Sequence, residues 1–218
     1  MLHKDVLTVS YLHRFQIKKT FSDILGLDGI EHFSLDLVRP DGEMLFLSGT
    51  PQHCFEICNR GLGKFDGIIS KEYYTNFEFY WWNDASHKAY SQQIKQIREN
   101  IIGLKHGFML VRKWDNFHLI YSFATKRNDN DFQSQVINKL NSYLKMGDYI
   151  YKEMREIYYD YCGFYEPPQI ESFFPFEGGI PPSRFTQNFL KKTKNFFSPD
   201  TSFPSNIIKF NFRDNISE

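Results

Sequence analysis

Two groups of residues in this sequence have side chains that could do chemistry: a His-Cys segment and a pair of adjacent tryptophans. His53 and Cys54 are neighbours, and neighbouring side chains on a helix point in different directions, so they do not pair as base and nucleophile. Cys58 follows Cys54 by one helical turn, a spacing typical of an apolar stripe. The three side chains could bind a metal, but structural zinc sites use four ligands at closer pairings. We therefore expect no metal and no cofactor.

The sequence also lacks the familiar motifs of catalysis. It contains no G-x-S-x-G, P-loop, dinucleotide-binding fingerprint or H-E-x-x-H, and its seven histidines are scattered. These absences favour a protein that is not an enzyme. An enzyme with an unrecognised site is the alternative.

The tryptophan pair gives the more specific prediction. Trp81 and Trp82 cannot share one face of a strand or helix, so one could line a cavity while the other packs elsewhere. A buried indole N–H needs a partner, and a ligand carbonyl is one candidate, whereas backbone carbonyls in a filled core are the other. We predict a ligand-binding hollow with aromatic walls, and strand register decides which side chains face it. The predicted ligand-binding residues are Tyr74, Tyr80, Trp81, Trp82, Phe108, Leu110, Tyr121 and Phe123.

Composition limits the classes of partner. The 26 basic residues balance the 26 acidic ones, which argues against direct nucleic-acid binding. No stretch approaches the roughly 20 apolar residues of a membrane span. The aromatic content of 18% instead suits a small hydrophobic or aromatic ligand. Three cysteines without framework spacing, and an N-terminus without a signal-peptide pattern, indicate a cytoplasmic protein.

Periodicity predicts an α+β domain over residues 1–162. The expected elements, in order, are a helix over 10–26, a hairpin of strands 32–38 and 44–47, a short helix over 51–58, an aromatic stretch over 73–82, a polar helix over 86–102, a second hairpin of strands 107–114 and 117–125, and a long helix over 129–161. Ala89, Ile94, Ile97 and Ile101 form the expected apolar stripe of the polar helix. This order predicts an antiparallel sheet flanked by helices, an α/β/α sandwich like that of PAS and GAF sensor domains.

Residues 163–218 differ in character. Prolines and paired glycines punctuate them, leaving room for a short helix over 184–196 and for a final strand over 207–212. Lys191, Lys192 and Lys194 are expected to form a solvated helix face. We predict that this segment is an extension of the domain or a linker.

The central part of the chain resembles the N-terminal sensor domain of the LuxR-type transcriptional regulators, the autoinducer-binding-like family. The residues that carry the resemblance are Trp81 or Trp82, the helix from Ser86, the turn Gly103-Leu104-Lys105-His106-Gly107, the hairpin from Phe108 to Thr125 and the helix from Asp129. The resemblance implies a bacterial ligand-sensing domain that acts in transcription regulation as a homodimer.

Two departures from the family pattern narrow this expectation. Lactone-sensing members use an Asp-Pro pair to receive the ligand amide, and no such pair lies between Tyr74 and Trp82. A standard acyl-homoserine lactone is therefore not the expected ligand. Residues after Cys162 show no helix-turn-helix pattern, so the chain is either a stand-alone sensor or part of a longer regulator. A bacterial interaction or effector protein, built on the same scaffold without a small ligand, is the alternative function.

Overall fold

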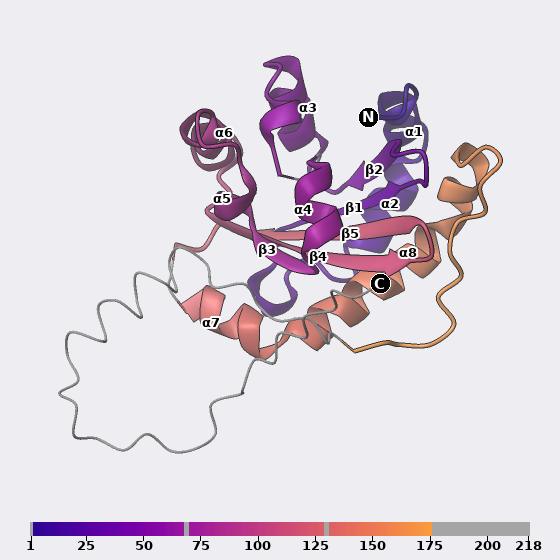
Figure 1. Ribbon diagram of the computed structural model, residues 1–218. Coiled ribbons are helices and arrows are strands. Elements are labelled where there is room, and N and C mark those ends of the chain that lie inside the picture. Colours follow the sequence, from indigo (N-terminus) through magenta and orange to yellow (C-terminus); the bar gives the residue numbers. More distant parts are fainter. Residues whose placement is uncertain (1, 68–69, 129–130, 176–218) are drawn as a thin grey trace, which may run out of the picture. The chain divides into compact units, whose positions relative to one another are not determined.

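A computed structural model describes residues 2–67, 70–128 and 131–175 of the chain. Its centre is a five-stranded antiparallel sheet with helices on both faces (Figure 1), so the predicted α+β class with an antiparallel sheet flanked by helices is confirmed. The strands are β1 (His32–Val38), β2 (Met44–Ser48), β3 (Phe79–Trp81), β4 (His106–Trp114) and β5 (Phe117–Thr125), in the spatial order β2-β1-β5-β4-β3. Among the described residues, no helix is both long and apolar enough to span a membrane.

Helices α7 (Asp131–Asn138) and α8 (Leu140–Tyr161) cover one face of the sheet. On the other face lie α3 (Pro51–Asn59), α4 (Lys71–Asn76), α5 (Trp82–Ala85) and α6 (Ser91–Gln96), and α6 continues into a π-helical turn over Ile97–Ile102. The chain begins with α1 (Val6–Leu12) and α2 (Arg14–Phe21), and 3-10 turns occupy Leu27–Gly29 and Gly63–Phe65. We call the first of these faces the α8 face and the second the α3 face.

Strand register assigns side chains to these faces. Phe108 pairs with Phe123 and Leu110 pairs with Tyr121, so all four lie on the same side. Their rings and those of the helix above interlock, since Phe108 and Phe123 both contact Tyr143 of α8 at centroid distances of 5.1 and 5.5 Å. The α8 face is therefore a filled aromatic core.

The structure differs from the sequence-based elements at three places. The expected first helix is two helices, because His13 leaves the helical conformation between α1 and α2. Strand β3 was not expected within the aromatic stretch, although it pairs with β4 from Phe79 to Trp81. The expected long helix is interrupted at Lys139, where φ is −121° and ψ is 20°.

The apolar stripe predicted for the helix over 86–102 is half wrong. Ile94 and Ile97 are buried, whereas Ala89 and Ile101 are exposed. Ala89 lies before the first turn of α6, and the π-helical turn after Gln96 changes which side chains face the core. In that turn Arg98 is buried in place of Ile101.

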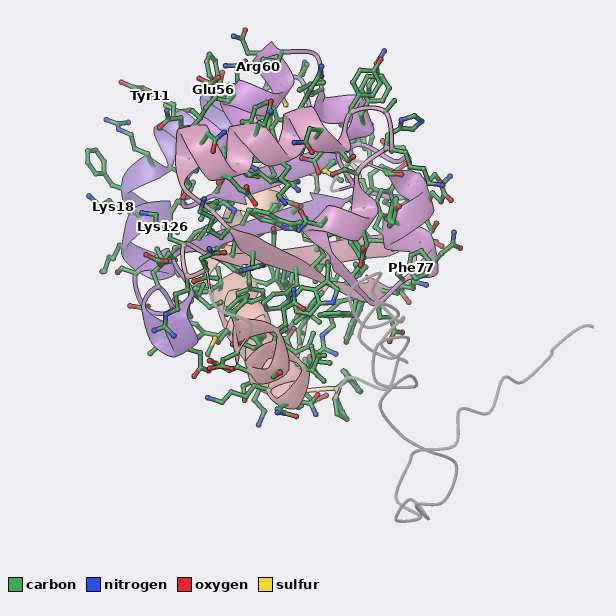
Figure 2. The ribbon with its side chains drawn as sticks, turned by 90° about the vertical axis from the view of Figure 1, so that its left-hand side faces the viewer. Tyr11, Lys18, Glu56, Arg60, Phe77 and Lys126 are labelled. Carbon is green, nitrogen blue, oxygen red and sulfur yellow. The ribbon has the colours of Figure 1, made fainter. Side chains whose placement is uncertain are left out.

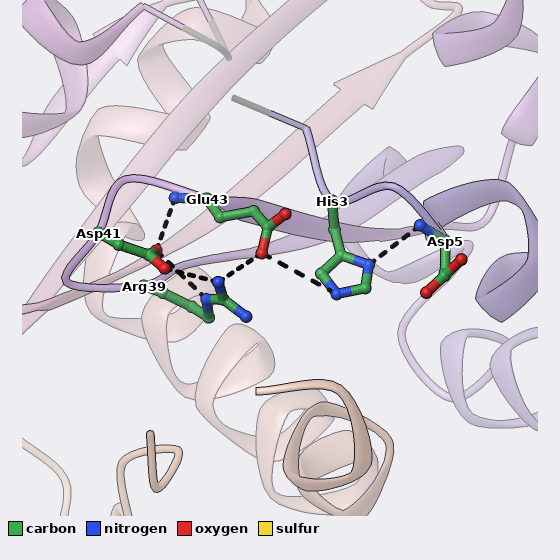
Figure 3. Close-up of polar contacts among 5 residues, drawn as sticks. All are labelled: His3, Asp5, Arg39, Asp41 and Glu43. Atoms are coloured by element: carbon green, nitrogen blue, oxygen red, sulfur yellow. Dashed lines mark hydrogen bonds and ion pairs between the residues drawn. The ribbon is translucent and has the colours of Figure 1, made fainter. Parts of the chain in front are cut away.

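The N-terminus is tied to the β1–β2 hairpin by a chain of polar contacts (Figure 3). The guanidinium of Arg39 contacts Asp41 at 2.6 Å and Glu43 at 2.5 Å, and Glu43 also lies 3.9 Å from the imidazole of His3. Nδ1 of His3 accepts a hydrogen bond from the backbone N–H of Asp5. The backbone N–H of His3 donates to the carbonyl of Met44 in β2. These contacts fix the start of α1 against the edge of the sheet.

Residues 163–175 run back along α8. The hydroxyl of Tyr151 donates to the carbonyl of Pro168, Arg155 donates to the carbonyls of Pro167 and Pro168, and Ile170 is buried. The first part of the expected extension thus contacts the domain. The helix predicted over 184–196, its lysine cluster and the strand predicted over 207–212 lie outside the described residues.

Close packing of α8 on the sheet makes a first testable prediction. A Cβ at Gly147 would overlap the ring of Tyr121, so alanine should lower the free energy of unfolding although it favours helix by about 1 kcal/mol. Overpacking costs about 1–3 kcal/mol, so we expect a net loss of up to about 2 kcal/mol in urea unfolding of Gly147→Ala. The exposed Ser142→Ala in the same helix is the control and should be neutral or stabilising. A stabilised Gly147→Ala would contradict the packing described here.

Candidate functional site

The α3 face of the sheet carries polar side chains at its centre. His32, Ser34 and Asp36 alternate along β1 and point to this face, and Ser34 lies opposite Ser122 of β5. All four are at least 98% buried. Polar groups at the centre of a sheet are costly to bury unless they find hydrogen-bond partners. Ser34 and Asp36 bond to each other within β1, and further partners must come from the covering helices or from a bound molecule.

The covering helices place a second layer of polar and aromatic side chains above these residues. The ring of His53 in α3 stacks on the indole of Trp82 in α5, with centroids 5.1 Å apart and planes 13° from parallel. Arg98 contributes a guanidinium 4.4 Å from the Trp82 ring, a cation–π contact. The indole N–H of Trp82 donates to Oγ of Ser122 at 3.0 Å. Trp82 thus joins the helical layer to the sheet.

Arg98 also forms a buried ion pair with the loop that follows α3. Its Nη2 lies 2.7 and 2.8 Å from the two carboxylate oxygens of Asp66, and both side chains are only 4% exposed. Its Nε donates to Nε2 of His53 at 3.3 Å. Because Asp66 balances the charge of Arg98, the helical layer presents no net charge from this pair to the sheet.

Several buried polar atoms in this layered site have no hydrogen-bond partner within the described residues. They are Nδ1 and Nε2 of His32, Oδ2 of Asp36, Nδ1 of His53 and the hydroxyl of Tyr80. Nε2 of His53 accepts a bond from Arg98, so a neutral His53 carries its proton on Nδ1 and has a free donor there. Each such atom costs about 1–3 kcal/mol. Several unpartnered polar atoms on one face of the sheet lower the stability of the protein. The same atoms could form hydrogen bonds with a bound ligand.

Burial disfavours the charged form of three of these groups. It lowers the pKa of His53 to about 3, and the positive charge of Arg98 acts in the same direction. Burial also lowers the pKa of His32, with His53 and Arg98 adding to the shift. For Asp36, burial raises the pKa well above its ordinary value, although a hydrogen bond from Ser34 opposes the shift. The site therefore offers neutral donors and acceptors.

A hollow of about 20 Å³ lies beside these groups, between the sheet and α3. This volume has room for about one water molecule. Its lining consists of Ser34, Asp36, Met44, Phe46, His53, Cys54, Ile57, Cys58 and Asp66. A larger guest would enter only if α3 moved away from the sheet. Only two side chains of that helix, His53 and Ile57, are buried.

The sheet divides the eight predicted ligand-binding residues into two sets. Tyr74, Tyr80 and Trp82 lie on the α3 face and share one cluster of buried residues. The other five, Trp81, Phe108, Leu110, Tyr121 and Phe123, lie on the α8 face, where the register places them together. All eight are buried. A single small molecule in the α3 face site could contact only the first set, and contact with any of the eight stays a prediction.

Sequence reasoning did not single out His32, Asp36, Asp66 or Arg98. The alternation of polar His32, Ser34 and Asp36 with apolar residues is typical of a strand with one face in water. Here helices cover that face, and only the three-dimensional structure shows that these polar groups are enclosed. In the described part of the chain, no group of three or more His, Cys, Asp or Glu side chains is arranged to hold a metal ion.

Comparison with solved structures finds three that are similar to this chain. The crystal structure of Escherichia coli SdiA in space group P6522 is 16% identical, with a TM-score of 0.45 over 86% of this chain and 77% of SdiA. SdiA in complex with octanoyl-rac-glycerol is 11% identical, with a TM-score of 0.40 over 90% of this chain and 72% of that chain.

A third structure is similar over a shorter part of the chain. CepR2, an N-acylhomoserine lactone dependent LuxR family transcription factor from Burkholderia cenocepacia, is 14% identical, with a TM-score of 0.48 over 68% of this chain and 97% of CepR2. All three similarities are distant in sequence. No protein-family model and no curated protein sequence matches the chain.

Proposed function

We propose that this chain is a small-molecule-sensing regulatory domain whose ligand binds on the α3 face of the sheet. The observation that carries the proposal is the set of buried, unpartnered polar atoms on His32, Asp36, His53 and Tyr80. A ligand that supplied hydrogen bonds to them would recover free energy that the unliganded protein lacks, since each unmade bond costs about 1–3 kcal/mol. Binding and ordering of the site are therefore coupled.

The chemistry of the site restricts the ligand. The imidazoles and the Asp36 carboxyl are held neutral by burial, and Arg98 is neutralised by Asp66. A charged ligand group would lose its hydration without gaining a counter-charge. We therefore propose an uncharged polar head with several donors and acceptors, on a hydrophobic or aromatic body that contacts Tyr74 and Tyr80. SdiA, which shares the fold, has been crystallised with octanoyl-rac-glycerol, but the proposal rests on this chain's own polar groups.

Sensing requires that ligand binding change the protein. The hollow beside α3 holds about one water molecule, so a ligand must bind a conformation in which α3 has moved. By binding that conformation more tightly, the ligand shifts the population toward it. A regulatory partner, including a second copy of the chain, would bind one position of α3 more tightly than the other. The three free thiols suit a cytoplasmic location for such a regulator.

Tyr80→Phe separates ligand binding from stability. The Tyr80 hydroxyl is buried and has no partner, so its removal should leave the unliganded protein as stable as the parent or more stable. The variant should bind the ligand about tenfold more weakly, because one hydrogen bond to the ligand is lost. Native mass spectrometry of protein purified from its own cells supplies the ligand, and calorimetric titration measures its affinity.

Tyr143→Phe is the matched control, because Tyr143 is a buried tyrosine on the α8 face. The Tyr143→Phe variant should bind the ligand with the same affinity as the parent. Equal affinities of parent and Tyr80→Phe would place the ligand elsewhere. If no molecule is retained and uncharged small molecules leave the melting temperature unchanged, the interaction or effector function becomes the better proposal.

A further inference from the structure

Helices α1 and α2 expose large apolar side chains that the sensing site does not use. Leu7, Tyr11, Leu12 and Phe15 are 61%, 64%, 59% and 72% exposed. The opposite side of the same two helices, with Val6, Val9, Ile17 and Phe21, is buried against the domain. The exposed apolar residues are therefore on the outer side of an otherwise anchored segment, and we name Leu7, Tyr11, Leu12 and Phe15 the outer stripe.

The outer stripe is continuous across the break at His13. Leu7 and Tyr11 are one helical turn apart on α1, and the guanidinium of Arg14 links Tyr11 to Phe15, lying 4.2 and 4.4 Å from the two ring centroids. Figure 2 shows Tyr11 and Lys18 projecting outward from this part of the protein. His3 contacts Glu43 and Met44 of the β1–β2 hairpin and accepts a hydrogen bond from the backbone N–H of Asp5, which holds the start of the segment in place. The outer stripe is thus presented on a fixed scaffold.

Positive charge surrounds the outer stripe. Between residues 4 and 19 the chain contains Lys4, Arg14, Lys18 and Lys19, all exposed, and one acidic residue, Asp5. The whole chain has no net charge, so this excess is local. Exposed apolar side chains among lysine and arginine are the arrangement by which helices lie in the interface of an anionic bilayer.

We propose that the outer stripe and its basic residues dock on the surface of an anionic lipid membrane. Apolar side chains would enter the boundary between headgroups and acyl chains, while Lys18, Lys19 and Arg14 would contact the anionic headgroups. This docking leaves the sheet and the α3 face site unchanged, so the proposal does not depend on the sensing function.

Charge and shape favour a membrane over two other occupants. A two-fold pairing of two copies would set the same basic patch against itself, which like-charge repulsion opposes. A folded protein partner normally meets a pocket for its anchor residues, whereas the hollows beside α3, α6 and α8 are lined by residues outside the outer stripe. A fluid anionic surface needs no such pocket.

Sedimentation of the full chain with vesicles tests the proposal. We expect binding to vesicles of equal parts phosphatidylglycerol and phosphatidylcholine, at least about tenfold stronger than to phosphatidylcholine alone, and weaker at high salt. Because each basic residue near such a surface contributes about a factor of five, Lys18→Glu/Lys19→Glu should weaken binding at least about 25-fold. Tyr11→Ser/Phe15→Ser should weaken it about tenfold through lost apolar contact.

Matched substitutions elsewhere control for net charge and apolar content. Lys71→Glu/Lys88→Glu and Phe55→Ser change exposed residues of the same types outside the outer stripe and should bind as the parent does. Urea midpoints equal to that of the parent show that every variant is folded. No binding of the parent, equal binding to both vesicle types, or equal loss in the controls would each overturn the proposal. Binding of a glutamate-rich peptide but not of vesicles, or self-association abolished by the same variants, would overturn it in favour of an acidic partner or a second copy.

Discussion

Arg98→Leu is expected to lower the free energy of unfolding by about 3–5 kcal/mol, because it leaves the carboxylate of Asp66 buried without its counter-charge. The same substitution removes the cation–π contact with Trp82 and the hydrogen bond to His53. Urea unfolding followed by circular dichroism at neutral pH measures the loss.

A double-mutant cycle isolates the ion pair from these other contacts. In the Arg98→Leu/Asp66→Asn double variant, the uncompensated charge is gone, so the loss should be smaller than the sum of the single losses by about 1–3 kcal/mol. The surface pair Arg60–Glu56, whose arginine side chain is 51% exposed, is the matched control. Arg60→Leu should change stability by less than about 1 kcal/mol. Additive losses for Arg98 and Asp66 would contradict the buried pair described here.

The protein is also expected to lose stability as the pH falls below 6.5. His53 has a pKa of about 3 in the folded protein and an ordinary value of 6.5 when unfolded, so between these values the unfolded state binds the extra proton. The contribution of His53 to stability therefore falls with decreasing pH by up to about 1.4 kcal/mol per pH unit, and its loss reaches about 2 kcal/mol near pH 5. His32, whose pKa is also lowered, adds a loss in the same direction.

The pKa shift of Asp36 changes stability with pH in the opposite direction. Its pKa is raised in the folded protein, so above 3.8 the unfolded state releases a proton that the folded state keeps, and stability falls as the pH rises. This dependence extends only up to the folded pKa of Asp36. Below that pKa, Asp36 reduces the loss of stability with falling pH that the histidines cause. Above that pKa it has no effect on the pH dependence.

His32→Leu separates these contributions without removing a hydrogen bond, because neither nitrogen of His32 has a partner. We expect the variant to be at least as stable as the parent at neutral pH and to lose less stability than the parent between pH 7 and pH 5. Unfolding in urea across this pH range gives the comparison. His87→Leu, at an exposed histidine, is the control and should keep the dependence of the parent. The same pH dependence in the parent and in His32→Leu would show that the imidazole of His32 is not held neutral.

The sequence predicted the elements with strong periodicity and turn chemistry. Both hairpins were predicted with nearly correct bounds, since β1 spans His32–Val38 as expected and Asp115 adopts the positive φ that its turn requires. Strand β3 has three residues within an aromatic run, which is too short to show alternation. The break at Lys139 also leaves no periodic signal, because the apolar positions continue on both sides of it.

The candidate site was predictable only in part. The tryptophan pair identified the right region, and Trp82 and Tyr80 do lie on the α3 face. The register of the hairpin, which the sequence does not determine, sends Phe108, Tyr121 and Phe123 into the opposite core. Arg98 and Asp66 are 32 positions apart, and charged residues at such a distance pair only through the fold.

The position of the two tryptophans has a consequence for signalling between the two sides of the sheet. Trp81 is the last residue of β3 and contacts Phe108, which in turn contacts Tyr143 of α8, while Trp82 is the first residue of α5 and bonds to Ser122. One peptide bond therefore joins an indole in each core. A guest that displaced Trp82 would also move the backbone of Trp81, so binding on one side of the sheet would reach the packing of α8 on the other through adjacent residues.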